Sequence, residues 1–300
     1  MRAGPLTTVQ DLGRTGYAHL GVPRSGALDA PALRRANVLV GNPVEAAGLE
    51  TTLMGCALRF EVAAVVAVAG AEAVVWVDKQ PVAAASAIEV AAGAVLDIGR
   101  AKRGVRSYVA VAGGIDVEPV LGSRSTDTLS GLGPPKLTDG MTLPIGNDLV
   151  ADRRRHEPPP PGWVGPSEAS GSDSFPALST GAVGFGVPGG GELALGVRLG
   201  PRDDWFVAGE LFGSPYTITP LSNRVGCRLA GSALTRTQAG ELPSEGVVLG
   251  AVQVPADGQP LIFLADHPTT GGYPVIGVVE DVTPLAQARP GTTVRFRAID

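Results

Sequence analysis

The chain has 300 residues, of which 42 are glycine and 26 are proline, and its formal net charge at pH 7 is -5. At about 150 residues per domain, this length predicts about two domains, each able to bury a large core. A negative charge without long runs of Lys and Arg argues against nucleic acid as the main partner, because phosphate neutralisation needs clustered cations. The two cysteines, Cys56 and Cys227, lie far apart and predict core residues in a reducing compartment.

The N-terminal stretch MRAGPLTTVQDLGRTG lacks the continuous apolar run of a secretory signal. The most apolar segment, Val62–Val77, contains Glu72 and falls short of the roughly 20 residues that a transmembrane helix needs. The three histidines, His19, His156 and His267, lack the spacing of a zinc site. We therefore expect a cytoplasmic protein that has no membrane segment and no metal site.

The first predicted element is a helix that begins after Asp29. Asp29 is a typical N-cap residue, Leu33 and Ala36 share one face of the helix, and Gly41 can end it. The next residues, Asn42–Glu45, read NPVE and have the pattern of a capping box, with proline at the first helical position. This pattern predicts the start of another helix.

Short valine-rich runs separated by Gly, Pro or Asp follow, which is typical of strands joined by turns. In the first half the predicted strands are Leu58–Val62, Val65–Ala69, Val74–Val77, Val95–Ile98 and Ser107–Ala112. In the second half they are Leu193–Leu199, Tyr216–Thr219, Val247–Val254, Leu261–Leu264, Val275–Val279 and Thr293–Phe296. Such dense strands without long helices between them predict a mainly β fold of barrels or sandwiches.

Residues 153–191 are rich in Pro, Gly and Ser, as in EPPPPGWVGPSEASGSDS, and predict a linker or mobile loop. This segment divides the chain into domains 1–152 and 192–300. In the second domain, VQVPADGQPLIFL predicts a hairpin whose turn contains Asp257 and Gly258. Thr283 and Pro284 predict the start of a last short helix.

Polar loops after apolar strands are the candidate sites. The first loop, Gly21–Asp29, contains Arg24, Ser25 and a helix N-terminus, a combination suited to an anion. A turn with a helix cap explains it equally well. The second loop, Gly113–Thr128, contains Arg124 between two serines, and an arginine can hold a carboxylate or phosphate with two hydrogen bonds. Pairing of this arginine with a nearby carboxylate is the alternative.

The third loop, ADHPTTGGYP (Ala265–Pro274), lies between two apolar runs. Two adjacent glycines allow backbone N–H groups to turn toward a ligand, two threonines add hydroxyl donors, and Asp266 is a candidate base. A hairpin with Asx and Ser/Thr turns is the alternative interpretation.

Several catalytic motifs are absent from the sequence. It contains no G-x-x-x-x-G-K-[ST] phosphate loop and no G-x-S-x-G nucleophile elbow. It also has no lysine in a Met-Lys-Met context, so we expect no biotin attached to this chain.

Six blocks in order resemble one family, the biotin-dependent carboxyltransferases, whose members are called allophanate hydrolase subunit 2, the C subunit of 5-oxoprolinase or Kip-type antagonist. The blocks are LTTVQDLGRTGYAHLGVPRSGALD, NVLVGNPVEAAGLETTLMG, YVAVAGGIDVEPVLGSRST, GPRDDWF, SEGVVLGAVQVPADGQPLIFLADHPTTGGYP and LAQARPGTTVRF. The resemblance covers about residues 4–150 and 193–297. It implies two cyclophilin-like β-barrel domains with a few short helices.

The resemblance also implies a function and partners. The leading expectation is a subunit of an ATP-dependent 5-oxoprolinase, a hydrolase that opens a lactam to glutamate and is active only as a heteromeric complex. Its expected partners are an allophanate hydrolase subunit 1 type protein, also called the B subunit of 5-oxoprolinase, and a LamB/YcsF-like protein, and ATP binds to this chain or to a partner. One alternative is transfer of a carboxyl group from carboxybiotin to urea or a similar small amide. Another is a non-catalytic protein that antagonises a kinase inhibitor.

Under the lactam-opening hypothesis the loops bind anions, stabilise developing negative charge and move a proton. The candidate catalytic residues are Asp266, His267, Thr269 and Thr270. The candidate residues for binding substrate or phosphate are Arg24, Ser25, Asp29, Arg124, Ser125, Arg224, Gly271, Gly272 and Tyr273.

Overall fold

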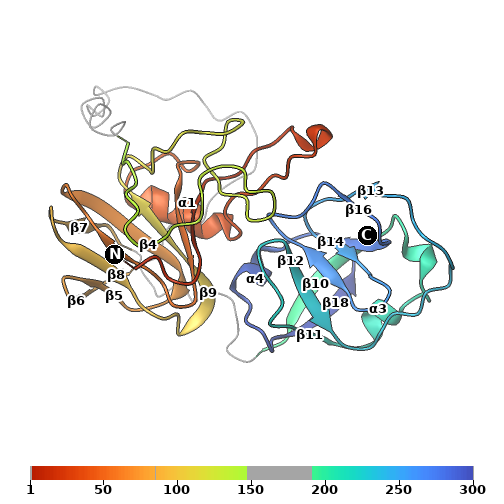
Figure 1. The fold of residues 1–300 in the computed structure, drawn as a ribbon. Coiled ribbons are helices and arrows are strands. Elements are labelled where there is room, and N and C mark those ends of the chain that lie inside the picture. The colour runs from red at the N-terminus through yellow and green to blue at the C-terminus, as the bar shows by residue number, and fades with distance from the viewer. Residues whose placement is uncertain (1, 85, 147–190, 300) are drawn as a thin grey trace, which may run out of the picture.

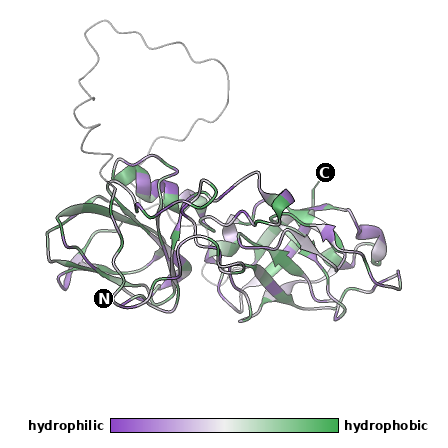
Figure 2. Ribbon diagram, turned by 45° about the horizontal axis from the view of Figure 1, so that its top comes forward, coloured by the Kyte–Doolittle hydropathy of each residue, from purple (hydrophilic) through white to green (hydrophobic). Residues whose placement is uncertain are grey.

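The structure of the chain is a computed structural model that describes residues 2–84, 86–146 and 191–299. Apart from Gly191, the predicted linker lies outside the described residues. The described residues form two β-rich halves that lie side by side (Figure 1). Figure 2 shows the strands of both halves largely in the hydrophobic colour, as expected for sheets that enclose a core.

The first half contains two antiparallel sheets. In spatial order, the five-stranded sheet consists of β1 (Thr7–Gln10), β2 (Gly48–Thr52), β9 (Arg103–Val111), β4 (Ala64–Glu72) and β7 (Ile88–Val90). The four-stranded sheet consists of β3 (Ala57–Arg59), β8 (Val95–Ile98), β5 (Val75–Val77) and β6 (Gln80–Val82). A core that includes Val66 and Val68 of the larger sheet and Leu96 and Ile98 of the smaller one joins the two sheets.

Helix α1 (Ala30–Leu39) covers the other face of the five-stranded sheet. Alternate residues of a strand point to opposite faces, so Ala67 and Ala69, which alternate with the core valines, face the helix and pack near Ala36. Asp29 begins the helix as predicted, because its Oδ1 accepts a 3.0 Å hydrogen bond from the backbone N–H of Ala32. This hydrogen bond fixes the start of the helix directly after the loop that ends at Asp29.

The second half is a closed barrel. Around the barrel, its strands are β10 (Leu193–Leu199), β17 (Val275–Val279), β14 (Ala251–Gln253), β15 (Leu261–Phe263), β12 (Gly226–Ala230), β11 (Tyr216–Ile218) and β18 (Thr293–Ala298). A parallel pairing of β10 with β18 closes the ring. Outside the ring, β13 (Glu245–Gly246) pairs with β16 (Thr270–Gly271), and the short helices of this half are η2 (Asp203–Trp205), α3 (Glu210–Gly213) and α4 (Thr283–Gln287). The first half contains one more short helix, η1 (Ala18–Leu20).

The two halves exchange contacts. Helix α4 of the second half packs against β9 of the first, and Figure 1 shows it on the side of the barrel that faces β9. The side-chain oxygen of Gln287 accepts the backbone N–H groups of Val105 and Arg106, at 2.9 and 3.0 Å. Conversely, Leu28 of the first half belongs to the hydrophobic core of the barrel. The junction is therefore a packed interface in which each half completes the other.

The mainly β prediction is confirmed. The barrel is closed in the second half, whereas the strands of the first half pair into two separate sheets. The hairpin is also confirmed: β14 pairs antiparallel with β15, and Gly258 has the positive φ, 73°, that its turn requires. Cys56 and Cys227 are free and buried, as expected of core residues.

The helix predicted from NPVE is wrong, because residues 42–45 form a turn and β2 begins at Gly48. The side-chain amide of Asn42 donates to the carbonyl of Val111, at 2.8 Å, and to Oδ1 of Asn37, at 3.1 Å. These bonds tie Asn42 to the end of α1 and the end of β9, so its side chain does not cap a helix. None of the helices within the described ranges has the length and apolar character that a bilayer crossing requires.

Candidate functional site

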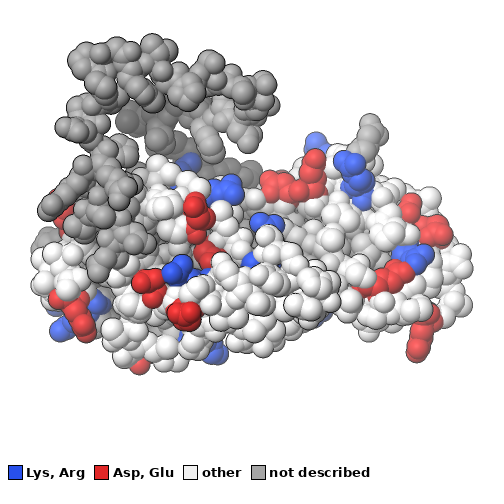
Figure 3. Space-filling model, turned by 90° about the horizontal axis from the view of Figure 1, so that it is seen from above, with Lys and Arg blue, Asp and Glu red and all other residues white. Residues whose placement is uncertain are grey.

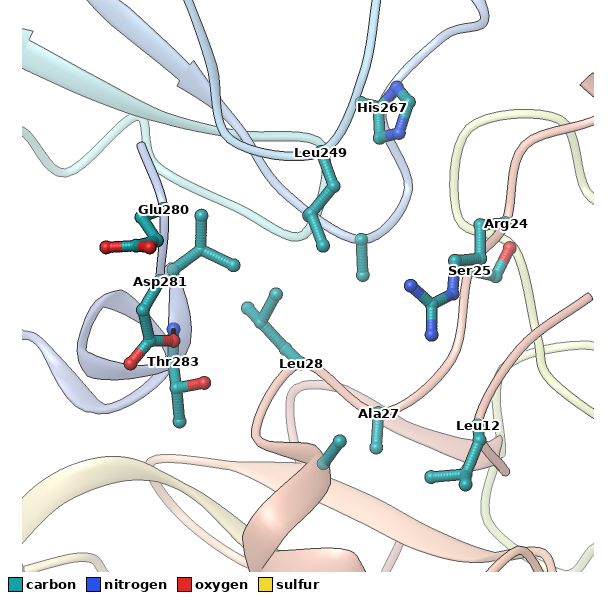
Figure 4. Close-up of a pocket in the computed structure, with 13 residues that line it drawn as sticks. Leu12, Arg24, Ser25, Ala27, Leu28, Leu249, His267, Glu280, Asp281 and Thr283 are labelled. Carbon is teal, nitrogen blue, oxygen red and sulfur yellow. Dashed lines mark hydrogen bonds between the residues drawn. The ribbon is translucent and has the colours of Figure 1, made fainter. Parts of the chain in front are cut away.

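A cavity of about 190 Å³ lies where the two halves meet (Figure 4). The first half contributes Leu12 and the loop that carries Arg24, Ser25, Ala27 and Leu28. The second half contributes the residues Leu249, Ala265, His267, Glu280, Asp281, Val282 and Thr283. The floor is apolar and the rim carries charges, an arrangement suited to a small polar molecule.

Arg24 supplies a free cation at this cavity. Its side chain is exposed, and among the described residues no hydrogen bond or ion pair engages its guanidinium. Figure 4 shows the guanidinium pointing into the cavity. A guanidinium without a protein partner presents several N–H donors to an anion, so anion binding by Arg24 stays a prediction with an accessible cation behind it.

Ser25, the next residue, is buried and held in a left-handed backbone conformation with φ 56°. Its hydroxyl donates to Oδ2 of Asp127, at 2.7 Å, and accepts from Nη1 of Arg14, at 3.0 Å. Its backbone N–H donates to the carbonyl of Ala265 across the cavity junction, at 3.1 Å. A non-glycine residue at positive φ persists only where its surroundings fix it, which these three bonds do.

His267 lines the cavity from the second half (Figure 4). Its Nδ1 lies 2.6 Å from the carbonyl oxygen of Pro268, and because a carbonyl can only accept, Nδ1 carries the proton. Nε2 then has a free lone pair and no partner within the described part of the chain. Burial lowers the pKa of His267 from 6.5, against the opposing effects of Pro268, Asp266 and Asp127. The imidazole is thus a neutral proton acceptor at pH 7.

Asp266, adjacent in sequence, is fully buried and turned away from the cavity. Its carboxylate receives Nε and Nη2 of Arg224, both at 2.9 Å, and both the backbone N–H and the hydroxyl of Thr128, at 3.0 and 2.6 Å. This pairing corrects the expectation that Asp266 acts as a base on a ligand, because the carboxylate is inaccessible and already bonded.

Arg224 is also buried, with no exposed side-chain surface. Besides Asp266, its guanidinium contacts Oε1 of Glu50, at 2.6 Å, and the carbonyl of Gly26, at 2.7 Å. Burial alone would lower the pKa of Arg224, but Glu50 and Asp266 outweigh it and raise that pKa. The expected role of Arg224 in binding an anionic ligand is corrected by this burial, since its charge is neutralised within the protein.

Glu50 completes this buried ion cluster, which we define as Arg224, Asp266, Glu50 and Arg106. Nε of Arg106 lies 3.3 Å from Oε1 of Glu50. Burial alone would raise the pKa of Glu50, but Arg224 and Arg106 lower it. The other oxygen, Oε2, accepts the hydroxyl of Tyr108, at 2.8 Å, and the backbone N–H of Leu28, at 3.0 Å.

The second-loop residues lie outside the cavity lining. Nη2 of Arg124 pairs with Oδ1 of Asp116, at 2.8 Å, and its Nε donates to the carbonyl of Val117. The hydroxyl of Ser125 donates to Oδ1 of Asp11, at 2.5 Å. The structure therefore matches the alternative of local pairing for this loop.

Asp29 is engaged at the helix start, where it also accepts Nε2 of Gln287, at 2.7 Å, and burial raises its pKa. Thr270 and Gly271 form β16, and Thr269 accepts the backbone N–H of Val247 through its carbonyl. The cavity lining includes none of the predicted residues Asp29, Thr269, Thr270, Gly271, Gly272 and Tyr273. The structure thus brings together Arg24, Ser25 and His267 from the predicted set.

Sequence reasoning missed the acidic side of the cavity. Glu280 and Asp281 are exposed there, and Oδ1 of Asp281 accepts the backbone N–H of Thr283 at the start of α4. An acidic residue two positions before Thr-Pro was the available signal, because it is typical of a helix start.

The described residues contain no cluster of His, Cys, Asp and Glu suited to a metal ion. On the face in Figure 3, cationic and anionic side chains are interspersed.

Comparisons with known proteins agree with this architecture. Residues 20–298 match the family described as carboxyltransferase domain, subdomain A and B. The C subunit of the 5-oxoprolinase of Escherichia coli (strain K12) is 39% identical over 99% of this chain and 89% of its own. That of Haemophilus influenzae is 34% identical over 97% and 88%. The urea amidolyase of Lachancea kluyveri is 33% identical over 98% of this chain and 16% of its own.

Solved structures show the same relationship. The crystal structure of TTHA0988 superimposes with a TM-score of 0.77 at 33% identity, over 98% of this chain and 54% of that one. The K. lactis urea amidolyase superimposes with a TM-score of 0.82 at 29% identity, over 99% of this chain and 18% of that one. This chain thus spans about half of the first solved chain and most of each bacterial relative. Over nearly its whole length, it belongs to the carboxyltransferase domain family, subdomains A and B.

Proposed function

We propose that the chain is the C subunit of a 5-oxoprolinase, an enzyme that opens 5-oxoproline to glutamate. The observation that carries this proposal is the match to two bacterial proteins named as C subunits of 5-oxoprolinase, at 39% and 34% identity over nearly the full length of each chain. Their designation as C subunits implies further subunits. We propose a B subunit of the allophanate hydrolase subunit 1 type and a LamB/YcsF-like protein as these partners, acting together in the cytoplasm.

The chemistry explains what the site must do. A lactam is a poor electrophile because its nitrogen donates electron density to the carbonyl. Transfer of a phosphoryl group from ATP to the lactam oxygen would give an activated carbon, which water attacks. The ring C–N bond then breaks, the nitrogen takes up a proton, and a second water hydrolyses the resulting acyl phosphate to phosphate and the second carboxylate. The complex therefore needs an anion-binding group and a proton acceptor near a small apolar cavity.

The cavity offers both groups. The guanidinium of Arg24, which has no partner within the described ranges, is available to bind the carboxylate of 5-oxoproline. His267 is neutral because burial lowers its pKa, and Nε2 accepts the proton of the attacking water. The apolar residues Leu12, Leu28 and Leu249 line the cavity and offer apolar surface for the ring carbons. In this assignment His267, and not Asp266, is the residue that accepts the proton.

The test is a reconstituted complex of this chain with its two companion proteins, supplied with 5-oxoproline and ATP, in which glutamate formation is measured. We expect glutamate to form only when all subunits and ATP are present. Arg24→Met and His267→Gln should each abolish most of the activity without preventing assembly. A complete, folded complex that forms no glutamate contradicts the proposal.

Carboxyl transfer to urea is the second candidate, because relatives named urea amidolyase match 98% of the chain and a solved urea amidolyase shares its fold. In that reaction the carboxyl group moves from a biotin on another chain to an amide nitrogen. Consumption of carboxybiotin that depends on urea, measured with this chain and a biotinylated partner, would favour it over lactam opening.

A further inference from the structure

Arg224 lies directly behind the cavity and contacts both of its walls. Nη2 donates to the carbonyl of Gly26, at 2.7 Å, within the wall that carries Arg24, Ser25 and Leu28. Nε and Nη2 bind the carboxylate of Asp266, which lies in the chain between Ala265 and His267, both lining residues of the opposite wall. One guanidinium thus joins the loop that supplies the cation to the loop that supplies the imidazole.

Glu50 extends this connection. Its Oε1 accepts Nη1 of Arg224, at 2.6 Å, while its Oε2 accepts the backbone N–H of Leu28, at 3.0 Å. The ion cluster therefore holds the first wall at two points, the carbonyl of Gly26 and the backbone N–H of Leu28.

We propose that Arg224 is a positioning residue that sets the placement of Arg24 relative to His267 without touching the ligand. The proposal rests on the proposed use of the cavity as the substrate site. Arginine is required because its planar guanidinium directs Nε, Nη1 and Nη2 at three different acceptors, on Asp266, Glu50 and Gly26. Lysine keeps the charge but has one nitrogen on a flexible stem and cannot reproduce this geometry.

Arg106 provides a matched control. It is also buried and also pairs with Glu50, at 3.3 Å. Its Nη1 donates to the carbonyl of Ala286 at the end of α4, and none of its hydrogen bonds reaches a residue of the two walls. Replacing Arg106 by lysine therefore perturbs the same buried cluster without disconnecting the cavity.

The first experiment compares Arg224→Lys with Arg106→Lys in the full chain, by NMR titration of the histidine ring protons. The chain has only three histidines, so His267 can be assigned by its loss in His267→Gln. In the wild type, burial lowers the pKa of His267 from 6.5. We expect Arg224→Lys to move this pKa back toward 6.5 and Arg106→Lys to leave it in place. Equal values in the wild type and Arg224→Lys, or equal shifts in both variants, would overturn the proposal.

The second experiment measures kcat and KM for 5-oxoproline in the reconstituted complex. We expect Arg224→Lys to lower kcat/KM by roughly tenfold to a hundredfold, the effect of a displacement of about 1 Å, and Arg106→Lys to change it by less than about threefold. If the wild-type complex is inactive, the proposed function fails while the titration still decides the positioning role.

If Arg224→Lys does not fold, Glu50→Gln is the second test variant. This change keeps the side-chain shape but removes the charge that anchors Arg224 to the first wall. We expect it to shift the His267 pKa in the same direction as Arg224→Lys. A folded Glu50→Gln protein with the wild-type pKa would overturn the proposal.

Discussion

The cavity lining and the buried ion cluster lie next to each other and contain similar polar side chains, but these side chains have different partners. In the cavity lining, Arg24 and His267 have polar atoms without partners among the described residues. In the ion cluster behind it, Arg224 and Asp266 are buried and bonded to each other. The first region is available to a ligand and contributes little to folding, whereas the second holds the fold and cannot touch a ligand. Asp266 and His267 are adjacent in sequence, but Asp266 belongs to the ion cluster and His267 belongs to the cavity lining.

The largest expected effect lies in the ion cluster. Asp266→Ala leaves the buried guanidinium of Arg224 with one carboxylate instead of two. Removing one partner of a buried ion pair typically lowers the free energy of unfolding by about 3–5 kcal/mol. Urea denaturation of the full chain measures this loss. A loss below about 1 kcal/mol would mean that the cluster does not support the fold and that the two regions are alike.

The next effect lies in the cavity. Arg24→Met removes an exposed cation that no described residue pairs with, so the free energy of unfolding should change by less than about 0.5 kcal/mol. Loss of a charged hydrogen bond to substrate costs about 2 kcal/mol, which raises KM for 5-oxoproline roughly thirtyfold. The steady-state kinetics of the complex test this, with Arg24→Lys as a partial replacement. Destabilisation without a change in KM would reverse the assignment.

A smaller effect is expected in the pH dependence of the free energy of unfolding, through His267 in the cavity lining. The pKa of folded His267 lies below its unfolded value of 6.5, so between these two values the unfolded state binds more protons. The corresponding stability is fully present above pH 6.5 and is lost as the pH falls through the folded pKa. Unfolding free energies measured from pH 7.5 down to 5 should show this decline. His267→Gln should flatten it, and an unchanged slope in that variant would contradict the burial of the imidazole.

The smallest effect is expected at the second loop. Arg124 forms a partly exposed pair with Asp116, and such pairs contribute roughly 0–1 kcal/mol. Arg124→Met should therefore change the free energy of unfolding by less than about 1 kcal/mol and leave kcat/KM within about twofold. A large loss of activity in a stable variant would show that Arg124 does bind substrate, as the sequence suggested, and would extend the cavity region to this loop.

Local sequence patterns predicted the elements whose residues are apolar and regularly spaced. The bounds of β10 and β17 agree with the predicted Leu193–Leu199 and Val275–Val279, and α1 begins at its predicted cap. Strands β1 and β2 were missed because they contain polar residues such as Thr7 and Glu50, which are buried with partners elsewhere in the chain. Burial of a polar residue depends on tertiary partners, and these are not visible in a local window.

The same limit applies to the site. The loop residues Arg24 and His267 could be predicted, because polar residues between strands are accessible by default. The sequence could not separate Arg24 from Arg124 or Arg224, since Glu50 lies 174 positions from Arg224 and only the folded chain brings them together. Leu249 was missed for a related reason, as an apolar residue becomes part of a cavity only through what stands opposite it.

The placement of Leu28 in the core of the barrel bears on how this polypeptide could be divided. A protease that cut between residues 146 and 191 would produce two fragments, each missing a piece that the other holds: Leu28 for the barrel and Gln287 for the backbone of β9. Such fragments should remain associated as a nicked dimer and should fail to fold when produced apart. Although the sequence suggests a domain boundary between residues 146 and 191, we expect that neither half folds independently of the other.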